Sequence, residues 1–491
     1  MTDSWATYRA ELGTDLHLDL SGSGSGTGSG AGTGGSTGPA PGLRTGLRDA
    51  LREAARTGRL APGTRLPSSR TLAADLGIAR NTVADAYAEL VAEGWLTARQ
   101  GSGTRVAERA ATAAPRRPRP PAAPRRPARS TAPVHSLLPG TPDLSTFPRA
   151  EWLKAYRKAL AAAPNDAFGY GDPRGRIELR TVLAEYLARA RGVHADPERL
   201  VIRSGYVNAL TFLAGVLRRR TPAAKAVAVE EYGLDHHREC LRAAGLRIPP
   251  LGVDEMGART GELADLPGVG AVLLTAAHQF PTGVALHPDR RAAAVDWARR
   301  TRGLILEDDY DGEFRYDRQP VGALQGLDPD RVVYLGTTSK ALAPGLRLSW
   351  MVLPEELTGL LSPHDNTSSA LEQLTLAGFM ASGAYDRHVR SMRLRYRRRR
   401  DDLVAALAAR APDVRISGIA AGLNAILELP PGSEQSVVRA AHWQGLAVEG
   451  LSRYRHPEAP GEGKDGLMVG YATPTDSAWA GALEALVRAL P

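Results

Sequence analysis

Two patterns of apolar positions divide the chain. From residue 136 to the C-terminus, short apolar runs such as "LVI", "AVLL", "LIL" and "VVYL" alternate with longer segments that repeat apolar residues at helical spacing. Because strands that alternate with helices are typical of an α/β domain, we expect one over residues 136–491. Residues 43–106 instead show short helical segments that end at glycines, and they predict a second, smaller domain.

Low-complexity sequence surrounds the smaller domain. A short N-terminal segment, 1–20, precedes a Gly/Ser-rich insert at 21–42, whose composition is typical of a flexible loop. The insert contains a G-x-G-x-x-G match, but no strand precedes it and no helix follows directly, so we reject it as a nucleotide site. Residues 107–135 are rich in proline, alanine and arginine and predict an extended linker.

Length and composition narrow the class of protein. A chain of 491 residues exceeds the size of one hydrophobic core, so we expect two or more domains. No apolar run approaches the roughly 20 residues that span a bilayer, and the first residues lack the pattern of a secretory signal. The single cysteine, Cys240, excludes an internal disulfide, so we expect a cytoplasmic protein.

The net charge of +9 is concentrated in the predicted linker. Residues 107–135 hold seven arginines and one acidic residue, Glu108, which leaves +6 in this segment. Such a stretch favours a polyanionic partner, most simply nucleic acid, although a soluble, self-repelling linker explains the composition equally well.

The smaller domain has the pattern of a helix-turn-helix followed by a hairpin. "PSSRTLAADLG" combines a serine cap, a short apolar-periodic helix and Gly77 as its end. A second helix ends at Gly94, and "WLTARQGSGTRVA" then predicts two short strands around a glycine turn. One face of the second helix carries apolar residues at helical spacing, namely Val83, Ala86, Tyr87 and Leu90.

The start of the second helix is a candidate for contact with DNA. Arg80, Asn81 and Thr82 open it, where a recognition helix presents side chains to base edges and phosphates. Capping by Asn81 and Thr82, with a solvated Arg80, is the simpler explanation, but the preceding capped helix and the basic hairpin favour DNA. Over almost its whole length the unit resembles the winged helix-turn-helix of GntR-type regulators. The predicted DNA-contacting residues are Ser68, Ser69, Arg70, Arg80, Asn81, Thr82, Arg99 and Arg105.

In the larger domain, polar or glycine-rich residues follow directly after apolar strands. Gly205 follows "RLVIRS" and leads into a helix, which aims backbone N–H groups and the helix dipole at an anion. Asp308 and Tyr310 lie in an acidic cluster after a second strand, and Lys340 lies in a hydroxyl-rich loop after a third. Since ligands of open α/β sheets bind beyond the carboxyl ends of the strands, we expect these groups to share one pocket.

The combination is complementary to pyridoxal 5′-phosphate. This cofactor needs an amine for a Schiff base, a carboxylate near its pyridinium nitrogen and a cup for its phosphate. Lys340 is the candidate amine, and its deprotonation is favoured by burial and by nearby cations such as Arg347. A solvated lysine and an ordinary polar strand end are the simpler explanations for Lys340 and Asp308, and the combination of groups makes them improbable.

The region 136–491 resembles a fold-type I aminotransferase. The resemblance implies a mixed, mostly parallel sheet flanked by helices, a small α+β C-terminal subdomain, and a catalytic Lys340 that bonds to the cofactor. It implies that Asp308 contacts the pyridine nitrogen and Tyr310 the 3′-oxygen, and that Tyr232 stacks on the ring. It implies a homodimer in which Tyr170 reaches the phosphate of the partner subunit, although Tyr170 and Tyr232 could also be half-buried packing residues. The implied phosphate contacts are Gly205, Tyr206, Val207, Thr337, Ser339 and Arg347.

Two positions depart from the aminotransferase pattern. Phe280 precedes the Pro-Thr-Gly turn where these enzymes usually carry an asparagine, with His278 and Gln279 upstream. Met468 stands where they usually carry an arginine that clamps the substrate carboxylate, and Arg453 and Arg455 are possible substitutes.

Two further groups of polar residues receive less weight. "HHREC" (236–240) holds metal-capable residues, but no second ligand pair follows at zinc-site spacing, so we expect no metal site. "RLRYRRRRDDL" (393–403) predicts a solvated helix face near a subunit interface, with DNA contact as an alternative.

Together the two halves resemble the MocR-type, GabR-like branch of the GntR regulators. The resemblance implies a transcription regulator of the cytoplasm that binds promoter DNA and senses pyridoxal phosphate, a small amine or an amino acid, as a homodimer. A working aminotransferase with an accessory DNA-binding domain is the alternative, and Met468 argues against it.

Overall fold

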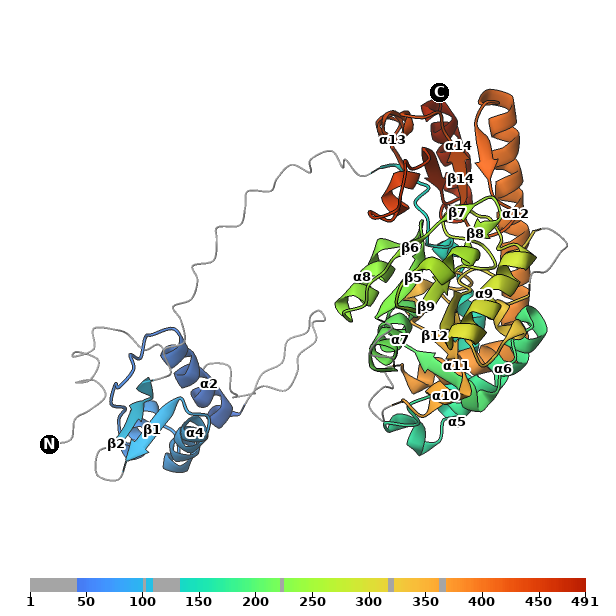
Figure 1. Cartoon of the computed structure of the whole chain (residues 1–491). Helices are drawn as coiled ribbons and strands as arrows, with labels where there is room; N and C mark the ends of the chain where they lie inside the picture. Colours follow the sequence, from blue (N-terminus) through green and yellow to red (C-terminus); the bar gives the residue numbers. More distant parts are fainter. Residues whose placement is uncertain (1–41, 100–102, 109–132, 221–224, 317–321, 362–367) are drawn as a thin grey trace. The chain divides into compact units, whose positions relative to one another are not determined.

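The computed structural model describes residues 42–99, 103–108, 133–220, 225–316, 322–361 and 368–491 (Figure 1). The chain divides into two compact units, Met1–Arg129 and Ser130–Pro491. The nucleotide-binding match rejected from the sequence, the whole of 21–41 and most of the predicted linker lie outside the described residues. Within the described ranges, no helix is long and apolar enough to cross a membrane.

Within its described residues, the N-terminal unit contains three helices and a hairpin (Figure 1). Ser68 caps α3 by accepting a hydrogen bond from the Thr71 amide at 3.1 Å, and Gly77 ends the helix with φ 66°. The apolar face predicted for α4, which includes Val83 and Leu90, packs in one core with the other two helices and the hairpin. The elements are α2 (Leu43–Arg56), α3 (Ser69–Leu76), α4 (Arg80–Ala92), β1 (Leu96–Arg99) and β2 (Gly103–Val106).

A seven-stranded sheet is the centre of the second unit, and its strand order is β4-β12-β11-β10-β9-β5-β6. β12 pairs antiparallel with both of its neighbours, and the other pairings are parallel. The mostly parallel sheet that the aminotransferase resemblance implied is therefore confirmed. The strands are β4 (Leu200–Arg203), β5 (Ala226–Glu230), β6 (Pro250–Leu251), β9 (Val269–Leu274), β10 (Leu304–Asp308), β11 (Val332–Thr337) and β12 (Ser349–Val352).

Helices cover both faces of this sheet, which explains why its strands are almost uninterrupted apolar runs. Alternate residues of β10 join different clusters: Leu304 and Leu306 pack with α7, and Ile305 packs with α9. The described helices of the unit are α5 (Arg149–Ala162), α6 (Ile177–Arg191), α7 (Tyr206–Arg220), α8 (Asp235–Ala243), α9 (Pro288–Thr301), α10 (Glu355–Thr358), α11 (Ala370–Ala381), α12 (Ala384–Arg410), α13 (Glu434–Trp443) and α14 (Asp476–Ala489).

A four-stranded antiparallel sheet with α13 and α14 forms the small C-terminal subdomain. Its strand order is β13-β14-β17-β16, which places β17 and Met468 in the interior of the sheet. The strands are β13 (Arg415–Ser417), β14 (Ala425–Glu428), β16 (Glu449–Gly450) and β17 (Gly466–Val469). Short pairs join β3 (His135–Ser136) to β15 (Leu446–Ala447) and β7 (Val253–Asp254) to β8 (Gly257–Ala258).

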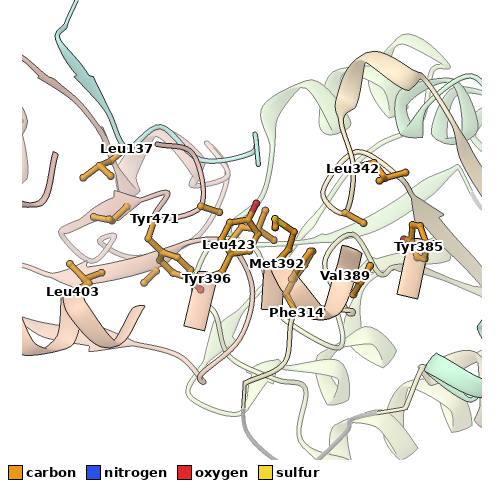
Figure 2. Packing of buried hydrophobic residues seen from close by; sticks show 14 of the residues in the cluster. Leu137, Phe314, Leu342, Tyr385, Val389, Met392, Tyr396, Leu403, Leu423 and Tyr471 are labelled. Atoms are coloured by element: carbon orange, nitrogen blue, oxygen red, sulfur yellow. The ribbon is translucent and has the colours of Figure 1, made fainter. Parts of the chain in front are cut away.

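Helix α12 packs one face into the largest apolar cluster of the unit. Tyr385, Val389, Met392, Tyr396 and Leu403 follow one another along this face at helical spacing, as Figure 2 shows. The cluster also contains residues of α6 and of the small sheet, so α12 connects the core of the large sheet to the C-terminal subdomain.

The expectation of a solvated face on α12 is only partly right. Residues 393–403 are not uniformly solvated, because Arg399 is buried on the same side as the apolar face. Its guanidinium pairs with Asp143 at 3.1 Å and with Asp476 at 2.7 Å. A buried charge is stable only when it is paired in this way, and the sequence spacing alone does not reveal the two acidic partners.

Leu90→Ala tests whether the N-terminal unit has its own core. Because Leu90 is fully buried there, we expect the substitution to destabilise this unit by about 2–5 kcal/mol. Hydrogen exchange should accelerate in peptides from 43–106 and stay unchanged in peptides from β10 and β11. Val91→Ala, at a neighbouring side chain that is 37% exposed, is the matched control and should change little. Equal acceleration in both units by Leu90→Ala would contradict separate cores.

Candidate functional site

A cavity of about 490 Å³ lies at the carboxyl ends of β5, β9, β10 and β11. Its other walls come from segments 138–141, 232–238 and 449–454, which are far apart in sequence. The strand order brings the ends of the four strands together, since adjacent parallel strands end at the same edge of the sheet. Of the residues predicted to bind a cofactor, those that line the cavity are Lys340, Asp308, Tyr310, Tyr206, Tyr232, Thr337 and Ser339.

Lys340 lies three residues beyond β11, and its amine reaches the cavity wall. The Nζ atom donates a hydrogen bond to the carbonyl oxygen of Gly140. Burial lowers the pKa of Lys340, while the carboxylates of Asp311 and Asp308 oppose the shift. A lowered pKa increases the fraction of neutral amine, which is the nucleophilic form.

Asp308 is the last residue of β10 and is buried in the cavity wall. Its Oδ1 atom and the hydroxyl of Tyr206 make no well-aligned hydrogen bond with the described residues, although the two side chains lie close enough to interact. Burial raises the pKa of Asp308 to about 8, and the Tyr206 hydroxyl and the positive charge of Lys340 act in the opposite direction. A buried carboxyl oxygen without a well-aligned hydrogen bond is suited to a cationic or N–H donor from a ligand.

An anion cradle lies next to the cavity, at the start of α7. Gly205 has φ 85°, and a Cβ atom built there would lie 2.7 Å from the Cζ atom of Arg347. Arg347 itself has φ 53°, and its Nη2 donates to the carbonyl of Ser204 at 3.0 Å. The two hydroxyls of Thr337 and Ser339 lie 2.8 Å apart. A helix N-terminus, a guanidinium and two hydroxyls are groups suited to bind an anion such as a phosphate.

Tyr310 lies near His278 and Phe280. The Tyr310 hydroxyl is 3.1 Å from Nδ1 of His278, and the same nitrogen is 2.8 Å from Oδ2 of Asp311. The ring of Phe280 meets Tyr310 edge-on, with centroids 5.9 Å apart. Phe280 therefore contributes an apolar surface to the cavity, where an asparagine would contribute a hydrogen-bond donor.

An apolar cluster lies beside the cavity, toward the small sheet. Met468 is 0% exposed and packs in one cluster with Phe280, Tyr454 and Tyr232. A carboxylate against this cluster would be desolvated without a partner, which is costly.

The two arginines proposed as substitutes for the carboxylate clamp lie in different environments. Arg453 lines the cavity and pairs with Glu449 at 3.0 Å. Arg455 pairs with Glu231 at 3.1 Å and donates to three backbone carbonyls, and it is not part of the cavity wall. The structure therefore favours Arg453 over Arg455 as the residue within reach of a ligand.

Tyr232, Val207 and Tyr170, three further predicted cofactor residues, differ in their surroundings. Tyr232 is buried, and its hydroxyl accepts a hydrogen bond from the Lys464 amide at 3.3 Å. Val207 and Tyr170 are outside the cavity wall. Tyr170 is 100% exposed, so the explanation that it is a half-buried packing residue is wrong. Its predicted contact with a partner subunit stays a prediction.

Two histidines that the sequence suggested only as metal-capable residues belong to the cavity. His236 and His237 line it, and the ring of His237 stacks on Tyr206 with centroids 4.5 Å apart. Burial lowers the pKa of His237 well below its ordinary value. Their position four and five residues after Tyr232 was the available signal.

Glu230 and Gly140 escaped the sequence analysis. Glu230 accepts hydrogen bonds from Thr275 and Gln279, and burial raises its pKa to about 7. It ends β5 directly before a loop, which is the same signal that identified Asp308. Nothing in the sequence around Gly140 indicates that its carbonyl meets Lys340.

In the N-terminal unit, the first turn of α4 faces solvent. The helix begins at Arg80, its N-cap position is Ala79, and no side chain makes a capping hydrogen bond. The simpler explanation that Asn81 and Thr82 cap the helix is therefore wrong. Arg80 and Asn81 are exposed, and Thr82 is half-buried, so their polar groups are accessible to a ligand.

The other predicted DNA contacts lie on α3 and the hairpin. Ser68 and Arg70 are exposed, and Ser69 is half-buried. Arg99 and Arg105 are exposed on β1 and β2, and Arg105 also donates to the carbonyl of Gly63 at 2.9 Å.

Comparison with known proteins gives two family matches. Residues 43–106 match the family described as bacterial regulatory proteins, gntR family, and residues 140–483 match aminotransferase class I and II. Two crystal structures of aminotransferases resemble the second region. An archaeal alanine:glyoxylate aminotransferase has a TM-score of 0.64 at 24% identity over 72% of this chain and 89% of its own. LysN, an α-aminoadipate aminotransferase from Thermus thermophilus, has a TM-score of 0.63 at 25% identity over 72% and 91%.

Relatives of similar length contain both regions. The probable rhizopine catabolism regulatory protein MocR of Rhizobium meliloti is 33% identical over 435 residues, 84% of this chain and 87% of its own. The pyridoxine biosynthesis transcriptional regulator PdxR of Corynebacterium glutamicum is 32% identical over 435 residues, 85% and 89%. An uncharacterized HTH-type transcriptional regulator of Bacillus subtilis, YdeL, is 34% identical over 419 residues, 82% and 87%.

These matches define the class of the protein. The chain belongs to the MocR-type subfamily of the gntR regulators, in which a helix-turn-helix domain precedes an aminotransferase class I and II domain. It is a transcriptional regulator, and the regulatory function predicted from the sequence is confirmed over that of a working aminotransferase.

Asp308→Asn tests the role of the buried carboxyl. The pKa of Asp308 is raised, so its stabilising effect is complete below its ordinary pKa and is lost as the pH rises through about 8. Without cofactor, the variant should therefore be at least as stable as the unsubstituted protein at pH 9, as melting temperatures at pH 6 and 9 would measure. Its affinity for pyridoxal phosphate should fall about tenfold or more, because one charged hydrogen bond is lost. An unchanged affinity and spectrum would contradict the assignment.

Proposed function

We propose that this regulator senses pyridoxal phosphate, or an amine that reacts with it, through the cavity that contains Lys340. The observation that carries the proposal is the presence of the Lys340 amine and the buried carboxyl of Asp308 in one cavity. Both belong to a chain whose N-terminal domain is of a DNA-binding family. Promoter DNA, in the cytoplasm, is the proposed second partner.

The residues present fit the cofactor. Pyridoxal phosphate, when bound, supplies an aldehyde carbon to which a primary amine bonds with loss of water. Lys340 is the proposed amine, and Asp308 would accept a hydrogen from the ring nitrogen. The cradle of Gly205, Arg347, Thr337 and Ser339 would hold the phosphate, with Tyr206 and Val207 at the start of the same helix. Tyr232 and Tyr310 would contact the ring and its 3′-oxygen.

An effector with a primary amine would compete with Lys340 for the same carbon. The lowered pKa of Lys340 supports this exchange. The lysine can leave the cofactor carbon as a neutral amine and does not have to take up a proton at the same time. At the other end of the effector, Arg453 is the candidate for recognising an anionic group, which would have to displace Glu449.

Weak fixation of the effector suits a sensor better than an enzyme. Rapid transamination requires the substrate to be held in one orientation by strong contacts near the reacting carbon. Phe280 offers no hydrogen bond, and Met468 offers no charge to a carboxylate. These two side chains favour slow or absent turnover, which agrees with a regulatory role.

Binding at the cavity must be coupled to DNA binding to act as a signal. A ligand shifts an equilibrium between conformations only by the difference in its affinities for them. We propose that the large domain dimerises and that occupancy of its cavity changes the separation of two helix-turn-helix domains. The full exposure of Tyr170 and the 60% exposure of Phe168 favour a partner subunit at this surface.

Lys340→Ala tests the proposal as a whole. The purified protein should show an absorbance band near the visible edge with pyridoxal phosphate, and the variant should lack it. Both proteins should bind the upstream region of their own gene in a gel shift, and only the unsubstituted protein should change its affinity or footprint when cofactor or amines are added. Repeated turnover of an amino donor by the unsubstituted protein, with no sequence-specific DNA binding, would instead support the aminotransferase.

Arg80→Ala tests the DNA-contacting turn. Loss of one phosphate or base contact should reduce DNA affinity about tenfold and leave the cofactor spectrum unchanged. Arg56→Ala is the matched control. Arg56 is the last residue of α2, is not among the predicted DNA contacts, and pairs with Glu53 at 2.6 Å. If a binding titration gave equal DNA affinities for all three proteins, Arg80 would be a solvated surface residue that does not contact DNA.

A further inference from the structure

We propose that Asp311 and His278 position the hydroxyl of Tyr310 as a hydrogen-bond donor to the 3′-oxygen of the bound cofactor. The inference rests on the proposed binding of pyridoxal phosphate and assigns roles to two residues outside the predicted site. It gives His278 and Asp311 the part of positioning residues, which act through Tyr310.

The geometry fixes which atom carries the hydrogen. His278 Nδ1 lies 2.8 Å from Oδ2 of Asp311, and an ionised carboxylate can only accept. The nitrogen must therefore be the protonated one, and it donates to Asp311. The oxygen of Tyr310 lies 3.1 Å from the same nitrogen, so it faces the N–H group of His278 and can only accept from it. The hydrogen of the Tyr310 hydroxyl is then excluded from Nδ1. It interacts with the carboxylate of Asp311, and an acceptor bound in the cavity would compete with Asp311 for it.

Tyr310 keeps that hydrogen in its buried setting. Burial raises its pKa well above the ordinary value, and the charges of Asp311 and Asp308 add to the shift. The hydroxyl is therefore neutral at any pH near 7. It is a donor that does not lose its proton to the solution.

Close packing against the backbone at Gly422 fixes the orientation of the His278 and Asp311 side chains. A Cβ atom at Gly422 would lie 2.2 Å from Cε1 of His278 and 2.6 Å from Oδ2 of Asp311. Gly422 has φ 75°, a conformation that glycine adopts without strain. The backbone of this loop therefore covers the pair directly, and His278 and Asp311 are each only 3% exposed.

Phe280, which stands where aminotransferases usually carry an asparagine, makes the contact of Tyr310 with the 3′-oxygen more important. With no amide at this position, the 3′-oxygen loses one donor, and Tyr310 has to supply the hydrogen bond from this side. Among the described residues, the charged and titratable groups that interact with the Tyr310 hydroxyl are Asp308 at the cavity and Asp311, His278 and Tyr471 behind it. Removing His278 changes one of these groups and leaves the others.

The test compares Tyr310→Phe, His278→Leu, His278→Asn and the double variant Tyr310→Phe/His278→Leu. The absorbance of the full-length protein with bound pyridoxal phosphate is titrated against pH. A donor to the 3′-oxygen favours its ionised, proton-free form, so loss of the donor should raise the pKa of the chromophore. We expect Tyr310→Phe and His278→Leu each to raise it by about one unit, the value of one charged hydrogen bond.

Two comparisons separate a positioning role from a structural one. Asparagine carries an N–H group close to the position of Nδ1, so His278→Asn should restore the pKa of the unsubstituted protein. The double variant should match Tyr310→Phe alone, because His278 acts through Tyr310. Additive shifts, or an unchanged pKa in His278→Leu, would overturn the inference while the cofactor site stands. The absence of any band in the unsubstituted protein would overturn the proposed function and this inference with it.

Discussion

The pairing of β10 with β11 is the constraint on which the cavity depends. The two strands are adjacent and parallel, and Asp308 lies opposite Leu335 in their register. The carboxyl at the end of one strand and the amine in the loop after the other therefore meet at one edge of the sheet. Burial favours the neutral form of both groups, because it lowers the pKa of Lys340 and raises the pKa of Asp308.

The rest of the site can be understood as additions to this pair. The left-handed turn at Gly205 and the guanidinium of Arg347 place positive potential beside it. The apolar cluster of Met468, Phe280 and Tyr454 closes the side toward the small subdomain. Such a cavity offers charged and hydrogen-bonding groups to a cofactor and few such groups to a second molecule. It can therefore bind the second molecule without converting it quickly.

Much of the fold and part of the site followed from the sequence because both depend on local patterns. Apolar runs identified β4, β9, β10 and β11, and the polar residues after them identified Gly205, Asp308 and Lys340. The helix-turn-helix followed from a cap, a glycine stop and one apolar face, although Ala79 rather than Asn81 proved to occupy the N-cap. Each of these signals lies within a dozen residues of chain.

The remaining features depend on contacts between distant segments, which no local pattern contains. Arg399 looked solvated until Asp143 and Asp476, more than 70 residues away on either side, were found against it. Gly140 meets Lys340, and Gly422 covers His278, through chain crossings of the same kind. The choice between Arg453 and Arg455 was likewise decided by Glu231, which lies in the sequence next to β5.

The central claim is a covalent bond between the amine of Lys340 and the aldehyde carbon of pyridoxal phosphate. Reduction of the loaded protein with borohydride makes such a bond permanent, and mass spectrometry of a digest then locates it. The account predicts a phosphopyridoxyl group on the peptide that contains Lys340 and on no other lysine at comparable yield. An unmodified Lys340 peptide, from a protein saturated with the cofactor before reduction, would contradict it.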